Sequence, residues 1–426
     1  MKYDLCIIGG AGHVGLPLGV SFAKKRVKTV LLDINEEWLK KIEAGIFPFK
    51  EKDGDKELGK ALKLGTLFTS AKPNVISQSG AILMVIGTPV DEYLNPDFNG
   101  LIKMIDKYFS YFKNGQTLIL RSTVYPGTSE RVQSYFMERG KKVGVAFCPE
   151  RIVQGKSLEE LQKLPQIISG FDGKTVERVK NLFQNITPRA IIEVRPIEAE
   201  LVKLFCNAWR YITFAVANQF FMIASDHNLD YHKIYEAMVK DYARSKDLPS
   251  PGFAAGPCLL KDTMQLAAFN NNNFFLGHSA MLVNEGLPNY LIQRLKKGAS
   301  PVSSQNLTTP ILADSKSLDN LLKQVSALGN LKTKTIGILG MAFKADSDDP
   351  RDSLSYKLRK IALGEAKKVL CHDVYIKDES FHPLDKVLAE SDILILASPH
   401  KEYRKIDPKK YSDKQFVDIW NVWKKY

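Results

Sequence analysis

The feature that most constrains the fold of this chain is a glycine pattern close to its start. Residues 10–15 read GAGHVG and lie between an apolar run at residues 3–8 and a helical pattern that begins near Val14. In a GxGxxG motif the first glycine permits a tight turn, the second lets the backbone approach a diphosphate, and the third allows close helix–strand packing. The pattern predicts a βαβ unit with a dinucleotide diphosphate at the helix N-terminus. The motif residues expected to contact the cofactor are Gly10, Gly12, His13, Val14 and Gly15.

An acidic residue indicates which dinucleotide is bound. Residues 28–33 form the next short apolar run, and Asp33 ends it eighteen residues after Gly15. A carboxylate at this position can accept hydrogen bonds from both ribose hydroxyls and repels a 2′-phosphate. The sequence therefore predicts NAD rather than NADP as the cofactor. A glycine-rich turn without a ligand is the alternative interpretation.

The pattern of strands and helices predicts the fold class and the domains. Apolar runs alternate with helical or polar stretches over roughly the first 190 residues, which predicts a parallel, doubly wound sheet. Residues 196–227 then read as one long helix, of a length that commonly forms a dimer core, and residues 284–297 are helical again. A second α/β unit begins at residue 335. The expected strands after the first βαβ unit are 81–86, 117–120, 143–147, 335–339, 369–372, 392–397 and 416–419.

The predicted fold is therefore α/β, with an N-terminal Rossmann domain, a central helical dimerisation domain and a C-terminal Rossmann-like domain. A stretch rich in Ser, Thr, Pro and Asn at residues 298–320 is interpreted as a linker or surface insertion. The predicted segments are residues 1–195, 196–297, 298–330 (the linker) and 331–426.

The composition is typical of a soluble globular protein. The chain has 426 residues, 44% hydrophobic and 25% charged, so two or three domains are expected. No apolar run reaches the roughly 18 residues that span a bilayer, and the first residues enter a strand directly, so we expect no membrane span and no secretory signal. The five cysteines form no CxxC pair. That argues against a zinc site or a disulfide scaffold, predicts no metal, and favours a reducing cytoplasm.

The net charge of +13 raises the question of a polyanionic partner. The lysines are spread along the whole chain, and no basic-aromatic motif of a nucleic-acid module is present. We interpret the charge as mostly solvated surface, with a share used on an anionic small substrate. Nucleic-acid binding is therefore not expected, and salt-sensitive retention on DNA would revive it.

One cysteine suggests chemistry beyond an ordinary alcohol dehydrogenase. Cys258 follows a loop rich in glycine and proline and precedes Lys261 and Asp262, a setting that favours a partly exposed thiolate. A thiolate can add to an aldehyde, lose a hydride to leave a thioester, and release an acid on hydrolysis, with Asp262 as a candidate base for the water. Together with the dinucleotide motif, this predicts oxidation of an alcohol to an acid. An inert buried cysteine is the alternative.

Two residues on the predicted long helix suit a developing oxyanion. Lys203 and Asn207 lie four positions apart, and Arg210 is three further on, so all three project from one helix face. A lysine beside an amide supplies fixed positive charge and a hydrogen-bond donor for an alkoxide. A solvated polar stripe is the alternative interpretation.

Polar residues follow several predicted strands, where ligands bind in open α/β sheets. Thr88 and Thr123 could contact the cofactor, and Glu150 could act as a general acid or base through water. In the last domain, Lys344 and Arg351 suit recognition of phosphate or carboxylate. Taken singly, these residues also fit ordinary turns, a solvated loop acid and surface charge.

The motifs together resemble the UDP-glucose/GDP-mannose dehydrogenase family of nucleotide-sugar 6-dehydrogenases. The resemblance covers nearly the whole chain in order. It implies an NAD domain, a central helical dimer domain and a UDP-binding domain, with four-electron oxidation of the sugar C6 alcohol to a carboxylate by two NAD. The motifs that carry it are GAGHVG, VIGTPVD, RSTVYPGT, CPER, KLFCNAWR, NEGLPNY, LGMAFKADSDDPRDS and SDILILASPH.

The resemblance also implies roles for individual residues. The catalytic positions it implies are the nucleophile Cys258, the base Asp262, the oxyanion-binding pair Lys203 and Asn207, and the strand-end residues Thr123 and Glu150. The contacts it implies for the substrate are Arg151, Arg210, Phe253 and Lys344, and Arg351 would contact the cofactor. In localisation and assembly it implies a cytoplasmic homodimer or higher homo-oligomer that serves polysaccharide biosynthesis.

The sequence departs from the family pattern around the sugar. The loop PGFAAGPC before the nucleophile is one residue shorter and poorer in glycine than the family pattern, and Gln154 replaces an acid typical of UDP-glucose enzymes. Cys-Pro-Glu-Arg and Arg210 resemble the UDP-N-acetylhexosamine branch, whereas Lys261-Asp262-Thr263 resembles the UDP-glucose branch. We expect a UDP-N-acetylhexosamine substrate (GlcNAc or ManNAc), with UDP-glucose as the alternative.

Two further hypotheses belong to other classes. A two-electron β-hydroxyacid dehydrogenase would share the NAD domain and a helical domain bearing Lys and Asn, but Cys258 and residues 335–420 argue against it. A non-catalytic nucleotide-binding regulator would keep GAGHVG, but it would not need Lys203, Asn207, Cys258 and Asp262 together.

Overall fold

The computed structural model describes residues 1–87, 98–254, 256, 258–298 and 330–423. The chain forms two compact units: unit 1 comprises residues 1–207 and 264–272, and unit 2 comprises residues 208–263 and 273–426. Thr88 and nearly all of the expected insertion at 298–320 lie outside the described residues. The domain boundaries proposed from the sequence stay predictions.

Unit 1 is built on a six-stranded parallel sheet with the strand order β3-β2-β1-β4-β5-β6. This is the doubly wound order of a Rossmann fold, so the predicted fold class is confirmed. A two-stranded parallel sheet, β7-β8, adds to it. The strands are β1 Tyr3–Ile8, β2 Thr29–Leu32, β3 Leu67–Ser70, β4 Ser79–Met84, β5 Thr117–Leu120, β6 Gly144–Phe147, β7 Gln166–Ile168 and β8 Ile191–Glu193.

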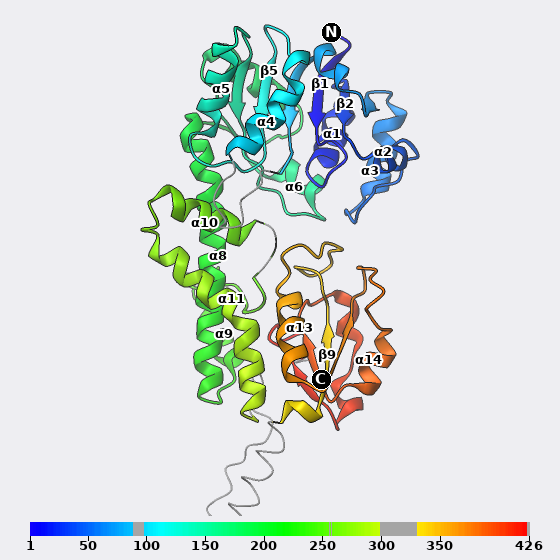
Figure 1. Ribbon diagram of the computed structural model, residues 1–426, viewed down its shortest axis with the longest axis vertical. Coiled ribbons are helices and arrows are strands. Elements are labelled where there is room, and N and C mark those ends of the chain that lie inside the picture. The colour runs from blue at the N-terminus through cyan, green and yellow to red at the C-terminus, as the bar shows by residue number, and fades with distance from the viewer. Residues whose placement is uncertain (88–97, 255, 257, 299–329, 424–426) are drawn as a thin grey trace, which may run out of the picture. The chain divides into compact units, whose positions relative to one another are not determined.

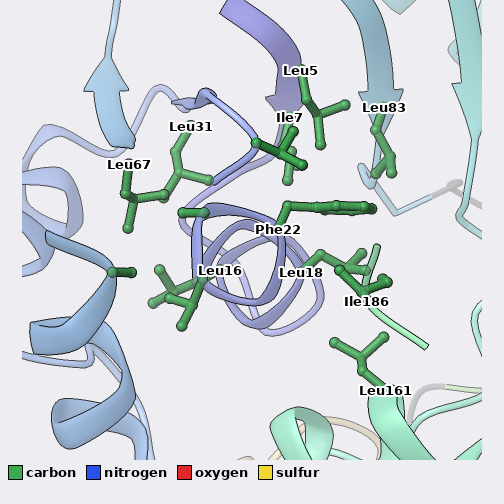
Figure 2. Close-up of a cluster of buried hydrophobic side chains, with 14 of the residues drawn as sticks. Leu5, Ile7, Leu16, Leu18, Phe22, Leu31, Leu67, Leu83, Leu161 and Ile186 are labelled. Carbon is green, nitrogen blue, oxygen red and sulfur yellow. The ribbon is translucent and has the colours of Figure 1, made fainter. Parts of the chain in front are cut away.

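Helices cover both faces of this sheet, which is why its strands read as continuous apolar runs. Along β1, Leu5 and Ile7 belong to one apolar core and Cys6 and Ile8 to the other. Figure 2 shows α1 seen along its axis, with side chains of four strands gathered around Phe22 and its neighbours. The helices of this part are α1 Gly15–Lys24, α2 Glu36–Glu43, α3 Gly54–Lys63, α4 Phe98–Tyr108, α5 Thr128–Glu138, α6 Ser157–Lys163 and α7 Gly173–Gln184, with 3₁₀ turns at Pro73–Gln78 and Phe109–Tyr111.

The predicted long helix is present as α8, Pro196–Asp226. Its later half lies beside α11 (Phe275–Lys296), as Figure 1 shows. The pair is joined through buried amides: Asn284 Nδ2 donates to the Tyr211 carbonyl at 3.0 Å and accepts at Oδ1 from Asn218 at 2.9 Å. In the sequence, α8 and α11 are separated by α9, Tyr231–Val239, and α10, Leu259–Phe269. No helix within the described ranges is both long enough and apolar enough for a membrane span.

Unit 2 also contains a four-stranded parallel sheet with the order β10-β9-β11-β12. All four strands expected after residue 335 are present, which confirms the second Rossmann-like unit. Strand order reverses between β9 and β11, and ligands of open α/β sheets bind at such a switch point. The elements are β9 Thr335–Leu339, α13 Leu354–Glu365, β10 Lys368–His372, α14 Leu384–Glu390, β11 Ile393–Leu396 and β12 Gln415–Val417, with 3₁₀ turns at Leu331–Thr333, Lys401–Lys405 and Pro408–Tyr411.

Candidate active site

The glycine motif forms a turn of closely packed backbone. A Cβ atom on Gly10 would meet the Leu31 Cα atom at 2.7 Å, and one on Gly15 would meet the Gly9 carbonyl oxygen at 2.3 Å. Gly9, which sequence reasoning missed, has φ +80°, a conformation that favours glycine. A Cβ atom on Gly12 would make only an ordinary contact of 3.5 Å with the Gly9 carbonyl oxygen. A side chain at Gly12 would therefore not clash with the fold, and the close approach of a diphosphate at this position stays a prediction.

Asp33 lies directly after β2 and fixes the glycine turn. Its Oδ2 atom accepts the Ala11 N–H at 2.9 Å, and Oδ1 accepts the Asn35 N–H at 3.0 Å. Within the described ranges no side chain caps the N-terminus of α1, so a diphosphate bound there would not compete with a capping side chain. The residues present at this strand edge therefore fit NAD.

A buried ion pair joins the segments that follow β5 and β6. Arg121 follows β5 and is 1% exposed, and its Nε and Nη2 atoms donate to Glu150 Oε2 at 3.0 and 2.7 Å. The other oxygen of Glu150 accepts the N–H groups of Arg151 and Ile152. Glu150 is 8% exposed, so its alternative interpretation as a solvated loop acid is wrong. These four hydrogen bonds fix the orientation of the carboxylate, and a defined orientation is one requirement for a general base.

Sequence reasoning missed Arg121 and its further partners. Its Nη1 atom donates to the Cys148 carbonyl at 3.0 Å, and Nη2 donates to Gln166 Oε1 at 2.9 Å. Its guanidinium carbon lies 4.7 Å from the centroid of the Phe183 ring. The available signal was a charged residue directly after the apolar run Leu118–Leu120, because a buried charge needs a partner.

The start of α8 holds the segment that follows β5. Glu200 is 1% exposed and accepts the N–H groups of Gly127 and Ser129 at 2.6 and 2.8 Å, at the start of α5. It thereby anchors the loop that carries Thr123. One and two turns later on the same helix, Lys203 is half-buried and Asn207 is 5% exposed. Their spacing places both on one helix face, and the oxyanion role stays a prediction.

Cys258 differs from the other cysteines in exposure. All five lie within the described ranges, and Cys258 alone is exposed. Burial raises the pKa of Cys6, raises that of Cys148 to about 12, and raises that of Cys371 to about 11, so these thiols are inert at neutral pH. Cys258 directly precedes α10, and a helix N-terminus stabilises a thiolate.

Asp262 lies one helical turn after Cys258 and is fully buried. Its N–H donates to the Cys258 carbonyl at 2.9 Å, which closes the first turn of α10. The Lys261 ammonium lies 3.1 Å from Asp262 Oδ1. The spacing of four residues places Asp262 one helical turn from the thiol.

The loop before Cys258 is fixed by contacts on two sides. Asn218 of α8 donates to the Gly252 carbonyl at 3.0 Å and accepts the Gly252 N–H at 2.8 Å. Gly256 has φ +106°, and its N–H donates to the Asp352 carbonyl at 3.3 Å. A Cβ atom on Gly256 would lie 2.5 Å from Cδ2 of Phe343. The loop after β9 is therefore in direct contact with the nucleophile loop.

Arg351, in the loop after β9, interacts electrostatically with the Cys258 thiol. Arg351 donates from Nε and Nη2 to the two oxygens of Asp349 at 2.9 and 2.6 Å. Hydrogen bonds to Asp349 raise the pKa of Arg351, and the charge of Cys258 contributes to the same shift. The Lys344 ammonium lies 5.7 Å from the Phe343 ring centroid. The Arg351 guanidinium and the Cys258 thiol therefore interact electrostatically within unit 2.

Three expected substrate contacts have distinct surroundings. Phe253 is 4% exposed and belongs to the same apolar core as Ile338 of β9. Arg210 is exposed beside Trp209, and Nη2 of Arg151 donates to the Pro165 carbonyl. Substrate contact by each of them stays a prediction.

Comparison with known proteins covers all three parts of the chain. Residues 3–187 match the NAD binding domain of the UDP-glucose/GDP-mannose dehydrogenase family, residues 197–285 match its central domain, and residues 337–425 match its UDP binding domain. A curated relative, the UDP-N-acetyl-D-mannosamine dehydrogenase of Methanocaldococcus jannaschii, is 26% identical over 98% of this chain and 92% of its own length.

Solved structures show the same fold. The UDP-D-ManNAc dehydrogenase from Pyrococcus horikoshii matches 98% of this chain and 96% of its own, with a TM-score of 0.85 and 25% identity. A UDP-glucose dehydrogenase from Pyrobaculum islandicum matches 98% of both chains, with a TM-score of 0.82 and 22% identity. At 22% identity the second likeness shows the fold alone.

Proposed function

The chain belongs to the UDP-glucose/GDP-mannose dehydrogenase family and is an NAD-dependent UDP-sugar dehydrogenase, and we propose that it oxidises the sugar C6 alcohol to a carboxylate through a covalent intermediate on Cys258. The observation that carries the proposal is the exposed Cys258 thiol at the N-terminus of α10, beside a loop of the UDP binding domain. An exposed, stabilised thiolate is what a second oxidation needs.

The proposed reaction is balanced with two NAD and one water per sugar. NAD held at the glycine turn and Asp33 would supply the hydride acceptor for both oxidation steps. The C6 alcohol first becomes an aldehyde, and the Cys258 thiolate adds to its carbonyl carbon to give a thiohemiacetal. Loss of hydride from that adduct leaves a thioester. Water then breaks the C–S bond, which releases the acid and returns the thiol.

Residues of the chain are assigned to the charges that develop. Lys203 and Asn207 stabilise the alkoxide and then the thiohemiacetal oxygen, because a cation and an amide donor favour the oxyanion over the neutral form. Glu150 and Asp262 take up protons from the alcohol and from the hydrolytic water. The two hydrogen bonds from Arg121 support the role of Glu150, since they fix the orientation of its carboxylate.

We propose a UDP-N-acetylhexosamine, GlcNAc or ManNAc, as the substrate. The Cys-Pro-Glu-Arg motif and Arg210 favour this branch, and the relatives named above include two enzymes named for UDP-N-acetylmannosamine. UDP-glucose is the second candidate, favoured by Lys261-Asp262-Thr263. The reaction chemistry is the same for both.

NADH formation with a panel of nucleotide sugars tests the reaction and the sugar together. We expect two NADH per sugar consumed with UDP-ManNAc or UDP-GlcNAc, and lower kcat/KM with UDP-GalNAc, UDP-glucose and GDP-mannose. One NADH per sugar would instead indicate a two-electron dehydrogenase. Binding of UDP without any NADH would indicate a nucleotide-binding regulator.

We also propose that the chain forms a homodimer through α8. The helix carries large apolar side chains on its surface: Trp209 is 67% exposed, Phe220 39% and Ile223 50%, and Val216 lies among them at 38%. At 100° per residue these four fall within an arc of about 60°, so they form one apolar stripe. A second copy would cover this stripe in a two-fold interface, which is the commonest oligomer symmetry.

Replacing Trp209 by lysine is expected to convert the dimer into monomers at micromolar concentration. A charge buried in an apolar interface is left unpaired and desolvated. Sedimentation velocity measures the outcome, with Leu363→Lys as the matched control because Leu363 is 58% exposed on α13, away from the stripe. A monomeric wild-type chain, or an unchanged dimer in Trp209→Lys, would contradict the proposal.

A further inference from the structure

The second sheet has an acid at the position that Asp33 occupies in the first. Asp373 directly follows β10, the neighbour of the first strand of that sheet, as Asp33 follows β2. Asp33 holds one amide of the glycine turn, whereas Asp373 Oδ2 accepts the N–H groups of Met341 and Ala342 at 2.6 and 3.1 Å. Its Oδ1 atom accepts two more amides, from Tyr375 and Ile376. The Asp373 side chain is 0% exposed, and both of its oxygens accept hydrogen bonds from the protein itself.

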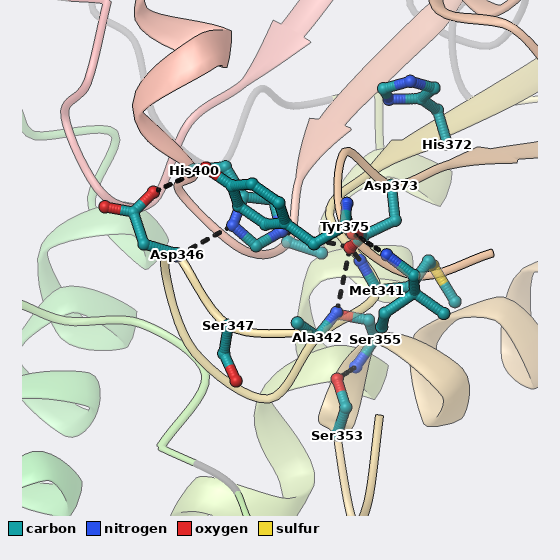
Figure 3. Close-up of polar contacts among 12 residues, drawn as sticks. Met341, Ala342, Asp346, Ser347, Ser353, Ser355, His372, Asp373, Tyr375 and His400 are labelled. Carbon is teal, nitrogen blue, oxygen red and sulfur yellow. Dashed lines mark hydrogen bonds and ion pairs between the residues drawn. The ribbon is translucent and has the colours of Figure 1, made fainter. Parts of the chain in front are cut away.

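A buried histidine completes this arrangement. His400 follows β11, is fully buried, and its Nε2 atom lies 3.0 Å from Asp373 Oδ2. Its Nδ1 atom accepts the N–H of Asp346 at 2.9 Å, so Nδ1 carries no proton and Nε2 donates to Asp373. Burial opposes the charge of Asp373, but the hydrogen bond from His400 and the amides lower its pKa to about 2. Figure 3 shows His400 between Asp346 and Asp373.

Asp373 and His400 hold the two ends of one loop, at Met341 and Ala342 and at Asp346. The loop from Gly340 to Asp346 follows β9, with φ +89° at Gly340 and +56° at Asp346. A left-handed aspartate is uncommon and persists where its surroundings hold it. Here His400 accepts its N–H, and Asp346 Oδ1 accepts the Lys401 N–H at 3.1 Å. Met341 and Ala342 are fixed by Asp373 at the opposite end.

Between these fixed ends lie Phe343 and Lys344, the two loop residues that are linked to the candidate active site. Phe343 touches Gly256 of the nucleophile loop, and Lys344 is an expected substrate contact. The Phe343 N–H donates to the Asp349 carbonyl at 3.1 Å, and Asp349 holds Arg351. The loop lies at the switch point between β9 and β11, where the UDP binding domain is expected to hold its nucleotide.

We propose that His400 and Asp373 are positioning residues for UDP-sugar binding, which hold the Gly340–Asp346 loop in the shape that presents Lys344 to the nucleotide. His400 links the ends of three strands: its own strand β11, the acid after β10, and the loop after β9. The pair acts through the loop and does not touch the reacting atoms. This inference rests on the proposed function for its substrate.

Variants at His400 separate its two hydrogen bonds. Asparagine can accept near the Nδ1 position but is too short to reach Asp373, and glutamine can reach Asp373 but offers no acceptor at Nδ1. Loop positioning requires both hydrogen bonds of His400, to the Asp346 N–H and to Asp373. We therefore expect His400→Asn and His400→Gln each to raise the KM for the UDP-sugar about tenfold or more, the effect of losing a buried hydrogen bond. The expected kcat changes less than about threefold, and the KM for NAD stays unchanged.

A neighbouring histidine provides the matched control. His372 ends β10, and its Nδ1 atom pairs with the Tyr403 hydroxyl at 2.8 Å rather than with the loop. His372→Asn is expected to keep the KM for the UDP-sugar within about twofold of wild type. Asp373→Ala removes the acceptor of two loop amides, so the KM for the UDP-sugar is expected to rise at least as much as in the His400 variants.

Calorimetric binding of UDP distinguishes this inference from the proposed function. Weaker UDP binding in both His400 variants, with wild-type melting temperature, supports the positioning role even if no UDP-sugar is oxidised. Normal UDP binding and normal KM in either folded variant overturns it, while the two-NADH stoichiometry of the wild type would leave the proposed function standing. An equal rise of both substrate KM values and a loss of kcat would indicate a merely structural role and overturn it as well.

Discussion

Cys258→Ser is expected to abolish formation of the acid product, with a loss of kcat of at least about 10³-fold. A serine hydroxyl at the N-terminus of α10 stays protonated at neutral pH, so it adds poorly to an aldehyde. The second oxidation therefore lacks its covalent adduct, and NADH formation per sugar falls below two. The side chain is exposed, so the change should leave the melting temperature unaltered.

A second cysteine serves as the control for this substitution. Cys206 is partly exposed on α8 and has no role in the proposed chemistry. Cys206→Ser should retain wild-type turnover and the ratio of two NADH per sugar. Full acid formation by Cys258→Ser would show that the thiol is not needed. It would favour direct oxidation of an aldehyde hydrate as the second step.

Gly256→Ala is expected to lower kcat/KM by about 10²-fold, although the residue carries no reactive group. Its φ of +106° disfavours any L side chain, and a Cβ atom would lie 2.5 Å from the Phe343 ring. Either the loop that carries Cys258 or the loop that carries Lys344 must then move. Displacement of a nucleophile by about 1 Å is costly because the reacting atoms lose their approach geometry.

The steric origin of this effect can be tested with a second substitution. Phe343→Leu in the Gly256→Ala background removes the ring and should recover part of the lost activity, while the backbone strain remains. Gly286→Ala is the matched control, because a Cβ atom there meets nothing within 4 Å and alanine favours a helix by about 0.5–1 kcal/mol. Wild-type kcat/KM in Gly256→Ala would contradict the coupling of the two loops.

Much of the fold could be predicted because its strands are buried on both faces. The runs at residues 3–8, 117–120 and 335–339 are strands with the expected bounds, and the long helix ends within one residue of its predicted end. Strands β3, β7 and β8 were missed: β7 and β8 have three residues each, and β3 and β8 are partly exposed, so no long apolar run marks them. Periodicity identifies a strand only where both of its faces are covered.

The candidate site could be predicted less completely. Motifs single out residues such as Glu150 and Cys258, whose chemistry is local to the sequence. They do not reveal Arg121, whose importance depends on a partner 29 positions away, or the link from His400 to Asp373, 27 positions away. Such pairs arise from the order in which parallel strands meet in a sheet, which no local pattern encodes.

The most direct test of the covalent mechanism is mass spectrometry of enzyme quenched in acid during turnover. Asp262→Asn, mixed with NAD and the UDP-sugar that the panel identifies, should hydrolyse the thioester slowly and accumulate a uronyl adduct on the peptide that contains Cys258. Wild-type enzyme should show the same adduct at lower occupancy. Accumulation of acid product while Cys258 stays unmodified in both proteins would contradict the account.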